Sequence, residues 1–361
     1  MSSFGGSLPQ GVLSAYAGFT GIASYGTNAD STTLRVETCT VKATQGIEGV
    51  NDIDGTVSNG RFLLQPLKIE GDIGFKFDIF STGAGDGGAG YTVAKQMLND
   101  AYRRDQNTGN LAARADQKQL KVRYHDTYGY TYGGILINTL RISCTAGQAV
   151  EFSAGLKGIS RTRFEHDDLS SFGNGTTTRL PSPVRVATYN DLTLALEDND
   201  SDPSTAGSAL DSSHYFVREF SISIDNQLED IYTLGGQLRA YDIVAKKRKV
   251  TGSFKILSNA ASGVAALKQY IEEHETRAIS RLKLTLNINK GAGVSERFLV
   301  LPAVVPSLED ISLTNNVSEL TFNFEAFGHD NDASGISPYQ NVAFLPDTGG
   351  ITQQDGYFPF A

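Results

Sequence analysis

The sequence predicts a mainly β protein that contains two similar domains in tandem. Three observations support this fold class. The 361 residues include 38 glycines, two methionines and no tryptophan, a composition that favours turns and bent strands over helical packing. Several segments alternate apolar and polar residues with a period of two, as half-buried strands do. The shift that places Val36 on Val217 also superimposes residues 36–77 on residues 217–258 without a gap, which indicates an internal repeat.

The predicted elements recur in the same order in the two copies. The first strand of each copy alternates apolar residues such as Val41 and Ile222 with polar ones. Residues 91–101 and 264–274 carry apolar residues at spacings of three and four, which predicts an amphipathic helix in each copy. We expect strands over residues 38–43, 69–77, 120–124 and 150–158 in the first copy, over 219–225, 250–258, 282–286 and 320–328 in the second, and an additional strand over 192–196.

The repeat defines the expected domain organisation. We expect an N-terminal arm at 1–33, the first copy at 34–158, a linker at 159–183, the second copy at 184–328 and a C-terminal tail at 329–361. The arm and the tail show little periodicity, so alone they bury too little apolar surface to offset a backbone entropy of about 1–2 kcal/mol per residue. Chance similarity is the alternative to a duplication, because period-two alternation is common among β-rich segments.

The charge and the cysteine content limit the classes of function. The formal net charge of −9 argues against tight, sequence-independent neutralisation of phosphates. No run of 18 apolar residues occurs and the first residues do not form a signal peptide, so we expect a soluble, unsecreted chain without membrane insertion. Cys39 and Cys144 are too few for a disulfide framework or a four-cysteine zinc site, and we expect reduced thiols.

Local motifs for catalysis or cofactor binding are incomplete. Residues 83–88 (GAGDGG) match the glycine pattern of dinucleotide-binding loops, but the strand before them alternates instead of being continuously apolar, which favours an ordinary loop. The acidic stretch 198–202 resembles the start of a calcium-binding loop. Further along such a loop, however, Pro203 stands where glycine is needed and Ala209 stands where a bidentate acid is needed. An irregular cation site is the alternative there to a solvated loop. The five histidines show no metal-binding spacing, so we predict no enzyme activity, no cofactor and no metal site.

One dense basic run, residues 246–249, invites comparison with a nucleic-acid patch. It leads into a predicted strand, where alternate side chains point to opposite faces, so it cannot form a single basic stripe. We favour a contact between subunits, with acidic loops of a neighbour as the partner, over plain solvated charge. The candidate contact residues are Asp52, Asp54, Arg61, Arg239, Lys246, Lys247, Arg248 and Lys249.

Part of the second copy resembles the tail tube proteins of tailed bacteriophages. The resemblance is carried by residues 219–226 (EFSISIDN), 232–235 (YTLG), 242–244 (DIV) and 247–254 (KRKVTGSF). In that family such a strand ends in an Asp-Asn turn, a long loop follows, and the next strand opens with a basic residue. The first copy departs from this pattern and keeps only the strand entrance at residues 69–71. With the repeat included, the resemblance covers about 270 residues.

The resemblance implies a small β-sandwich or barrel with one flanking helix in each copy, joined to its neighbours in a large inner β-barrel. Rings of that family contain six domains, so a tandem pair implies three chains in a pseudo-hexameric ring. With about four wall strands per copy, the bore would be about 38 Å, wide enough for duplex DNA. We expect an acidic wall that repels phosphate, and we expect the arm, the tail and the loops 44–66 and 225–247 to order on assembly and to stack the rings.

The implied function is that of a structural virion protein whose stacked rings conduct DNA during ejection. Its implied partners are further copies of itself, the tape measure, the baseplate or distal tail and terminator proteins, a sheath in tails that have one, and double-stranded DNA in transit. The protein would be made and assembled in the host bacterial cytoplasm. A baseplate hub or tail adaptor ring is the alternative. An unrelated β-rich enzyme or secreted binding module, with an organised polar pocket, is a third class.

Overall fold

The computed structural model describes most of the chain between residues 21 and 326. The described segments are 21–26, 32–50, 61–79, 89–102, 118–125, 128–165, 185–198, 215–234, 238–246, 249–258, 282–289, 295–314 and 317–326. Within them, antiparallel strands predominate and one α-helix is present, α2 (Ala89–Tyr102). The predicted mainly β class is therefore confirmed.

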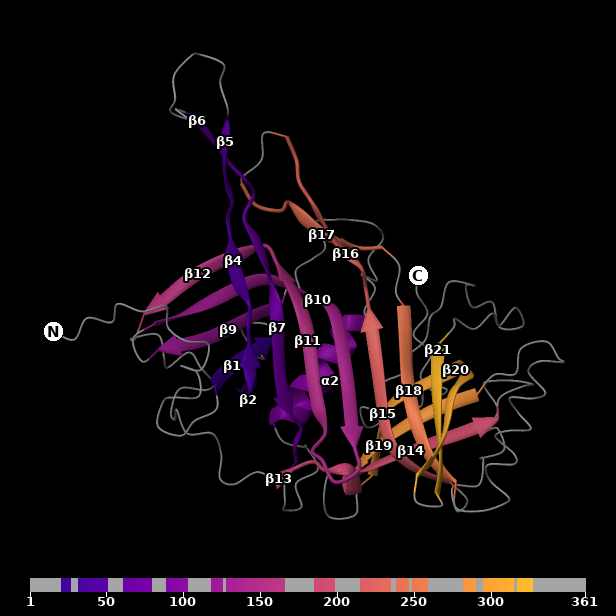
Figure 1. Cartoon of the computed structure of the whole chain (residues 1–361). Coiled ribbons are helices and arrows are strands. Elements are labelled where there is room, and N and C mark those ends of the chain that lie inside the picture. Colours follow the sequence, from indigo (N-terminus) through magenta and orange to yellow (C-terminus); the bar gives the residue numbers. More distant parts are fainter. Residues whose placement is uncertain are drawn as a thin grey trace, which may run out of the picture.

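A continuous antiparallel sheet of eight strand positions crosses the molecule, and we call it the wall (Figure 1). Its last position is shared by two short strands that pair with the same neighbour. The positions are, in spatial order, β20 (Ser295–Thr314), β21 (Val317–Ala326), β18 (Lys249–Ser258), β15 (Tyr215–Asp225), β10 (Tyr128–Thr145), β11 (Glu151–Gly158), β7 (Lys68–Lys76), and β3 (Thr38–Cys39) with β4 (Lys42–Thr44).

Two long strands carry the sheet from the wall into a second layer. The first part of β10 pairs with β9 (Lys118–His125) and with β12 (Ser160–Glu165), and its second part pairs with β11. The pairing with β9 shifts register between Gly133 and Ile135, and Gly134 has a φ of 67°. A bulge with a left-handed glycine bends a strand. In the same way β20 pairs first with β19 (Leu282–Asn289) and then with β21.

The two halves of the chain have the same strand order. The first half runs β1 (Gly21–Gly26), β9, β10, β11, β7, β3/β4, and the second runs β14 (Leu192–Asp198), β19, β20, β21, β18, β15. Two hairpins extend from the same end of the wall in Figure 1. The first hairpin is β5 (Ile47–Val50) with β6 (Arg61–Leu64), and the second is β16 (Leu228–Ile231) with β17 (Asp242–Ala245).

The pairing register repeats between the halves. Ala43 lies opposite Ile69, and Ile224, which the repeat aligns with Ala43, lies opposite Val250. The hairpins follow the same rule, since Ile47 faces Leu64 and Leu228 faces Ala245. The strands that share these ladders are therefore equivalent position by position at the shift read from the sequence.

One predicted equivalence is two residues out of register. The sequence matches Phe152 to Phe322. In the structure Phe152 lies opposite Phe75, whereas Leu320 lies opposite Ile256, which is the equivalent of Phe75. Phe152 is thus equivalent to Leu320. A displacement of two residues keeps each side chain on its face, so alternation alone cannot distinguish the two registers.

The hydrophobic core is continuous across the halves. Phe298 of β20, in the second half, packs against Phe77 and Tyr91 of the first half, with ring centroids 5.3 and 5.6 Å apart. Phe77 also lies 5.7 Å from Phe152 of the wall. All four residues are buried, and such aromatic contacts add to the stabilisation from buried area. Tyr91 belongs to α2, so this cluster fixes the helix against the sheet.

Two further predicted elements are confirmed: the helix expected over 91–101 is present as α2, and the strand expected over 192–196 is present as β14. The helix expected over 264–274 lies outside the described residues. Other elements differ from the sequence predictions. Strand β1 lies within the predicted arm, and β12 lies within the predicted linker. The predicted loops 44–66 and 225–247 contain the two hairpins. Their four-residue strands are too short to produce a clear period-two pattern.

Candidate assembly interface

The two halves are joined through the main chain by the ladder between β10 and β15, which we call the internal junction. Its register runs from Thr139 opposite Asp225 to Thr145 opposite Glu219. At its ends Asn226 donates its main-chain N–H to the oxygen of Asn138 at 2.8 Å, and Ala146 donates to Arg218 at 2.7 Å. An edge strand of one half thus extends the sheet of the other, which satisfies donors and acceptors that an edge would leave open.

The Asp-Asn turn identified in the sequence lies at one end of this junction. Gln227 has a φ of 47°, and its N–H donates to Asp225 Oδ1 at 2.9 Å. The side chain of Asn226 is buried, and its Nδ2 donates to the main-chain oxygens of Ala101 at 3.0 Å and Ile137 at 2.9 Å. Ala101 belongs to the last turn of α2, where carbonyl groups lack partners within the helix. Asn226 therefore ties the second half to both the helix and the wall of the first.

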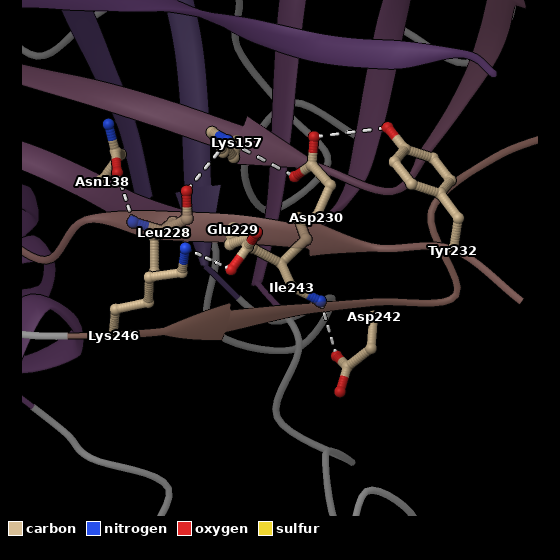
Figure 2. Close-up of polar contacts among 9 residues, drawn as sticks. All are labelled: Asn138, Lys157, Leu228, Glu229, Asp230, Tyr232, Asp242, Ile243 and Lys246. Carbon is tan, nitrogen blue, oxygen red and sulfur yellow. Dashed lines mark hydrogen bonds and ion pairs between the residues drawn. The ribbon is translucent and has the colours of Figure 1, made fainter. Parts of the chain in front are cut away.

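The second hairpin rests on the wall strands of the first half, as Figure 2 shows. The N–H of Leu228 donates to Asn138 Oδ1 at 2.9 Å, and Lys157 Nζ donates to the oxygen of Leu228 at 3.0 Å. The same Lys157 Nζ lies 3.5 Å from Asp230 Oδ1, and both of these side chains are about one-fifth exposed. Tyr232 Oη donates to Asp230 at 3.4 Å. Partial burial and the charge of Asp230 together raise the pKa of Tyr232.

Further contacts link the base of the first hairpin to the second hairpin and close the second hairpin on itself. The N–H of Leu67 donates to the oxygen of Leu238 at 2.9 Å, and Leu67 forms a parallel bridge with Arg239. Across the second hairpin, Lys246 pairs with Glu229 at 2.5 Å, as drawn in Figure 2. Both side chains of that pair are more than half exposed, so the pair contributes little to stability.

The two hairpins differ in how well their equivalent apolar side chains are covered. Ile47 and Leu63 of the first hairpin are 70% and 56% exposed. Their equivalents in the second hairpin, Leu228 and Val244, are half-buried. The second hairpin lies on β10 and β11 of the first half, and the equivalent surface for the first hairpin would be β20 and β21. These strands lie at the opposite end of the wall (Figure 1).

The wall ends on two open edges within the described part of the chain. In residues 305–314, β20 pairs with β21 on one side, and no described strand pairs with its other side. At the far end, β4 pairs only with β7 among the described strands. Proline is confined to edge strands because it lacks an N–H, and Pro306 lies in this part of β20. Unpaired edges of this kind are sites for pairing with another chain.

The wall has one apolar and one polar face. The apolar face is buried and includes Ile73, Ile142 and Phe254. The polar face carries serine, threonine and charges of both signs, with a shallow hollow of about 640 Å³ lined by Arg141, Ser221, Ser253, Asn323 and Glu325 among others. The acidic residues on this face include Glu70, Asp72, Glu151, Glu219, Asp225, Glu319 and Glu325, and the basic residues include Lys42, Lys68, Lys76, Arg141, Lys157, Arg218, Lys249 and Lys255.

Ion pairs between neighbouring strands balance much of this charge. Lys255 lies 3.7 Å from Glu219 and Lys249 lies 4.0 Å from Glu325, and Arg218 pairs with Glu319. The sequence predicts a predominantly acidic wall. The described polar face carries both acids and bases, and an acidic lumen stays a prediction. Net charge does not report which residues share a face of a sheet.

The predicted contact residues fall in three groups. Lys246 and Lys249 pair within the chain with Glu229 and Glu325, and Arg239 is exposed beside Leu67. Arg61 begins β6. Asp52, Asp54, Lys247 and Arg248 lie outside the described residues, and a role of any of the eight between subunits stays a prediction. Sequence reasoning found Asn226 only as part of the Asp-Asn turn. It did not identify the contacts that Asn138, Lys157 and Asn226 make, because their partners are distant in the chain.

No cluster suited to a metal ion occurs among the described residues. The glycine-rich stretch 83–88 and residues 199–202 of the acidic loop lie outside them. Cys39 and Cys144 are not joined in a disulfide, and burial raises the pKa of Cys144 to about 11. No described helix is long and apolar enough to cross a membrane.

The comparison with protein families gives a match that includes all of the described residues. The family model described as "Phage tail tube protein" matches residues 15–326, which include both halves of the wall and both hairpins. A search of curated proteins found no match. A family match over this much of the chain shows membership, and that family is structural rather than enzymatic. The chain therefore belongs to the phage tail tube protein family and is a component of the virion tail.

Proposed function

We propose that three copies of this chain close into a ring and that stacked rings form the tail tube through which DNA leaves the virion. The family match over residues 15–326 carries this proposal. The equal strand order and register of the two halves favour two tube domains per chain, with copies at 34–158 and 184–328. A chain with two equivalent domains needs three subunits to fill six places.

The dimensions of the wall are compatible with a DNA conduit. Eight wall positions per chain give 24 strands in a trimeric ring. At a spacing of about 4.8 Å and a tilt of about 40°, the circumference is about 150 Å and the backbone diameter about 48 Å. Inward side chains of about 5 Å on each side leave a bore of about 38 Å. A duplex about 20 Å across would pass with water around it.

The polar face of the wall is suited to line this bore. Its serine and threonine hydroxyls keep water at the surface, and paired charges such as Lys255 with Glu219 offer few free cations to phosphate. Retention of DNA depends on the release of counterions by unpaired Lys and Arg. We propose that the balance of charges on this face, rather than an excess of acid, keeps the passage non-adhesive.

Other roles follow from membership of a tail. The self-assembled tube would contact the tape measure, the terminator and the baseplate or distal tail proteins, and a sheath in a contractile tail. We propose that the chain has no catalytic role and that it is made and assembled in the host bacterial cytoplasm. The predicted contact residues, such as Lys247 and Arg248, would act between rings.

Electron microscopy of the purified protein tests the proposal. We expect hollow filaments whose cross-sections have threefold symmetry with a sixfold outline, and a bore of about 38 Å. Single rings that never stack would favour a hub or adaptor. Filaments with six chains per ring would contradict the two-domain count, and a monomer under all assembly conditions would contradict the proposal as a whole.

A further inference from the structure

The internal junction supplies a geometry for the contact between neighbouring chains. We propose that β4 and the first hairpin of one chain dock on β20 and β21 of a second copy, in the register of the β10–β15 ladder. This inference rests on the ring proposed above and names the edge and the residues that close it.

The two open edges of the wall are equivalents of the two strands that meet inside the chain. In the second half β15 pairs with β18, as β3 and β4 pair with β7 in the first half. In the first half β10 pairs with β9 and β11, as β20 pairs with β19 and β21 in the second. The junction of β15 with β10 therefore has one counterpart, β4 with β20, and both strands of that counterpart are open within the described chain.

The register of this counterpart follows from rows of paired residues across the wall. One row in the first half runs Asp72, Gly155, Thr139, and continues across the internal junction to Asp225. The equivalent row in the second half runs Ser253, Asn323, Ser307. The residue that continues this row must be the equivalent of Asp225, which is Thr44, because Asp225 faces Lys249 as Thr44 faces Lys68. Ser307 of one chain thus lies opposite Thr44 of the next.

Both residues of this pair are available in the single chain. The side chains of Thr44 and Ser307 are exposed. The hydrogen bond between Asn226 and Asn138 lies one residue beyond the pair Thr139–Asp225, so that pair is of the non-hydrogen-bonded kind, with Cα atoms about 4.5 Å apart. The same spacing for Thr44 and Ser307 is short enough for a disulfide between cysteines at these positions.

The neighbouring row brings opposite charges together. The row Gly74, Ser153, Arg141 ends opposite Ser223 across the internal junction. Its equivalent runs Lys255, Thr321, Asp310, and the equivalent of Ser223 is Lys42. The ladder of β20 with β21 shifts register between Leu308 and Asp310, so the position after Leu308 in this ladder is Asp310, which falls opposite Lys42 of the next chain. Opposite charges on facing strands contribute about 0.2–1 kcal/mol and disfavour other registers.

Pro306 fits this junction although it lacks an N–H. Pro306 precedes Ser307 as Asn138 precedes Thr139, although β10 has a bulge at Asn138 whereas β20 pairs regularly through Pro306. At the internal junction Asn138 accepts the N–H of Asn226 through its carbonyl oxygen. A proline keeps that carbonyl, so it can accept the N–H of Gln45, the equivalent of Asn226. Before assembly, the missing donor makes this edge a poorer partner for unrelated strands.

The exposure of the first hairpin is accounted for by the same docking. Leu228 is half-buried because its hairpin contacts Asn138 and Lys157 of β10 and β11. Ile47, its equivalent, is 70% exposed in the single chain. Placed against β20 and β21 of a neighbour, the first hairpin would gain the cover that the second hairpin already has.

Cysteine cross-linking tests the register. The variant carrying both Thr44→Cys and Ser307→Cys is assembled under reducing conditions, imaged, oxidised and run on a denaturing gel without reductant. We expect most chains of assembled rings to become covalent trimers. The single variants Thr44→Cys and Ser307→Cys should remain monomeric on the gel, which controls for the native Cys39 and Cys144. The variant with Thr44→Cys and Ser312→Cys, five residues out of register, should also remain monomeric.

The outcomes separate this inference from the proposed function. Tubes that form normally but give no cross-link between Thr44→Cys and Ser307→Cys would overturn the register and leave the tube intact. Covalent trimers would support both proposals. Failure of the unmodified protein to form rings or tubes would count against the proposed function itself.

A charge reversal provides a second measurement if the cysteine variant fails to assemble. Lys42→Glu and Asp310→Lys each place like charges across the junction, and each should lower the yield of tubes several-fold. The double variant should restore most of the yield. Single variants that assemble normally, or a double variant that assembles no better than the singles, would contradict the pairing.

Discussion

Asn226 Nδ2 donates a hydrogen bond of 2.9 Å to the main-chain oxygen of Ile137, across the junction between the two halves of the chain. The amide is buried and also bonds the oxygen of Ala101 in α2. Its main-chain N–H bonds Asn138. The Asn226 side chain therefore connects the second half to the wall and the helix of the first half. Because this amide is buried, losing one of its hydrogen bonds would cost stability.

Replacement of Asn226 by alanine should weaken the junction. The change leaves two buried carbonyl groups without these partners, and we expect a loss of about 1–3 kcal/mol in the free energy of unfolding. Urea denaturation followed by circular dichroism measures it. Gln45→Ala is the matched control, because this equivalent residue is exposed in the single chain and should change stability by less than about 0.5 kcal/mol. Equal losses in both variants would argue against the role assigned to Asn226.

Gly252 should not tolerate a side chain. A Cβ atom at this position would lie 2.2 Å from Phe324 Cζ and 2.4 Å from the main-chain oxygen of Ser221. Overpacking of this kind costs about 1–3 kcal/mol, so Gly252→Ala should lower the Tm by several degrees. Adding Phe324→Leu removes the ring that covers Gly252 and should recover part of the loss relative to Phe324→Leu alone. An unchanged Tm for Gly252→Ala would show that both the Phe324 ring and the main chain at Ser221 give way, and would contradict the close packing at Gly252.

The ion pair between Lys157 and Asp230 should hold the second hairpin against the wall. Both side chains are partly buried and Lys157 also bonds the oxygen of Leu228, so a double-mutant cycle with Lys157→Met and Asp230→Asn should give a coupling of about 0.5–1 kcal/mol. Hydrogen exchange in β16 and β17 should accelerate in either variant. Lys246→Met, which removes an exposed pair within the hairpin, is the control and should leave exchange at the wall contact unchanged. A coupling energy of zero between Lys157 and Asp230 would indicate that main-chain contacts, and not this ion pair, hold the second hairpin on the wall.

Cys144 should resist alkylation in the folded protein. Burial raises the pKa of this thiol from 9.0 to about 11, so at pH 8 its thiolate fraction falls about a hundredfold relative to the unfolded chain. Peptide mass spectrometry after iodoacetamide treatment measures the rate. Between pH 9 and 11 the unfolded chain ionises this thiol and the folded chain does not, so stability should decline as pH rises through that window. Cys144→Ala should reduce the decline, and labelling at the unfolded rate would contradict the burial.

Truncation should distinguish the predicted arm from the fold. Strand β1 pairs with both β2 (Thr32–Val36) and β9, so a chain that starts at residue 21 should keep its thermal stability, whereas one that starts at residue 27 should lose several degrees of Tm. If residues 1–20, the part of the predicted arm (1–33) that precedes β1, are needed for assembly, the first truncation should fold but fail to form tubes in negative-stain images. Full-length tubes from that truncation would remove the arm from the assembly mechanism.

Local periodicity was sufficient to predict single strands and the helix of the first half. The alternation through Ile73 and Phe75 defines a strand with one buried face, and the spacing of Tyr91, Met97 and Ala101 defines a helix. These signals depend only on which residues must leave water together. The shift that aligns residues 36–77 with 217–258 likewise located equivalent strands in advance, because both copies use the same sequence distances between these paired strands. The two hairpins were predicted only as loops.

The sequence by itself determined the strand faces, the helix of the first half, the repeat and the family resemblance. It did not determine that β10 and β15 pair, since Thr139 and Asp225 carry no local sign of their contact. Nor did it decide the two-residue offset of Phe152, which alternation leaves degenerate. Only the tertiary structure decided that one wall contains both halves and ends on two open edges. Hydrogen bonding between distant strands is a property of the folded chain, and the residues that make it are chosen by the register of the whole sheet rather than by their neighbours in sequence.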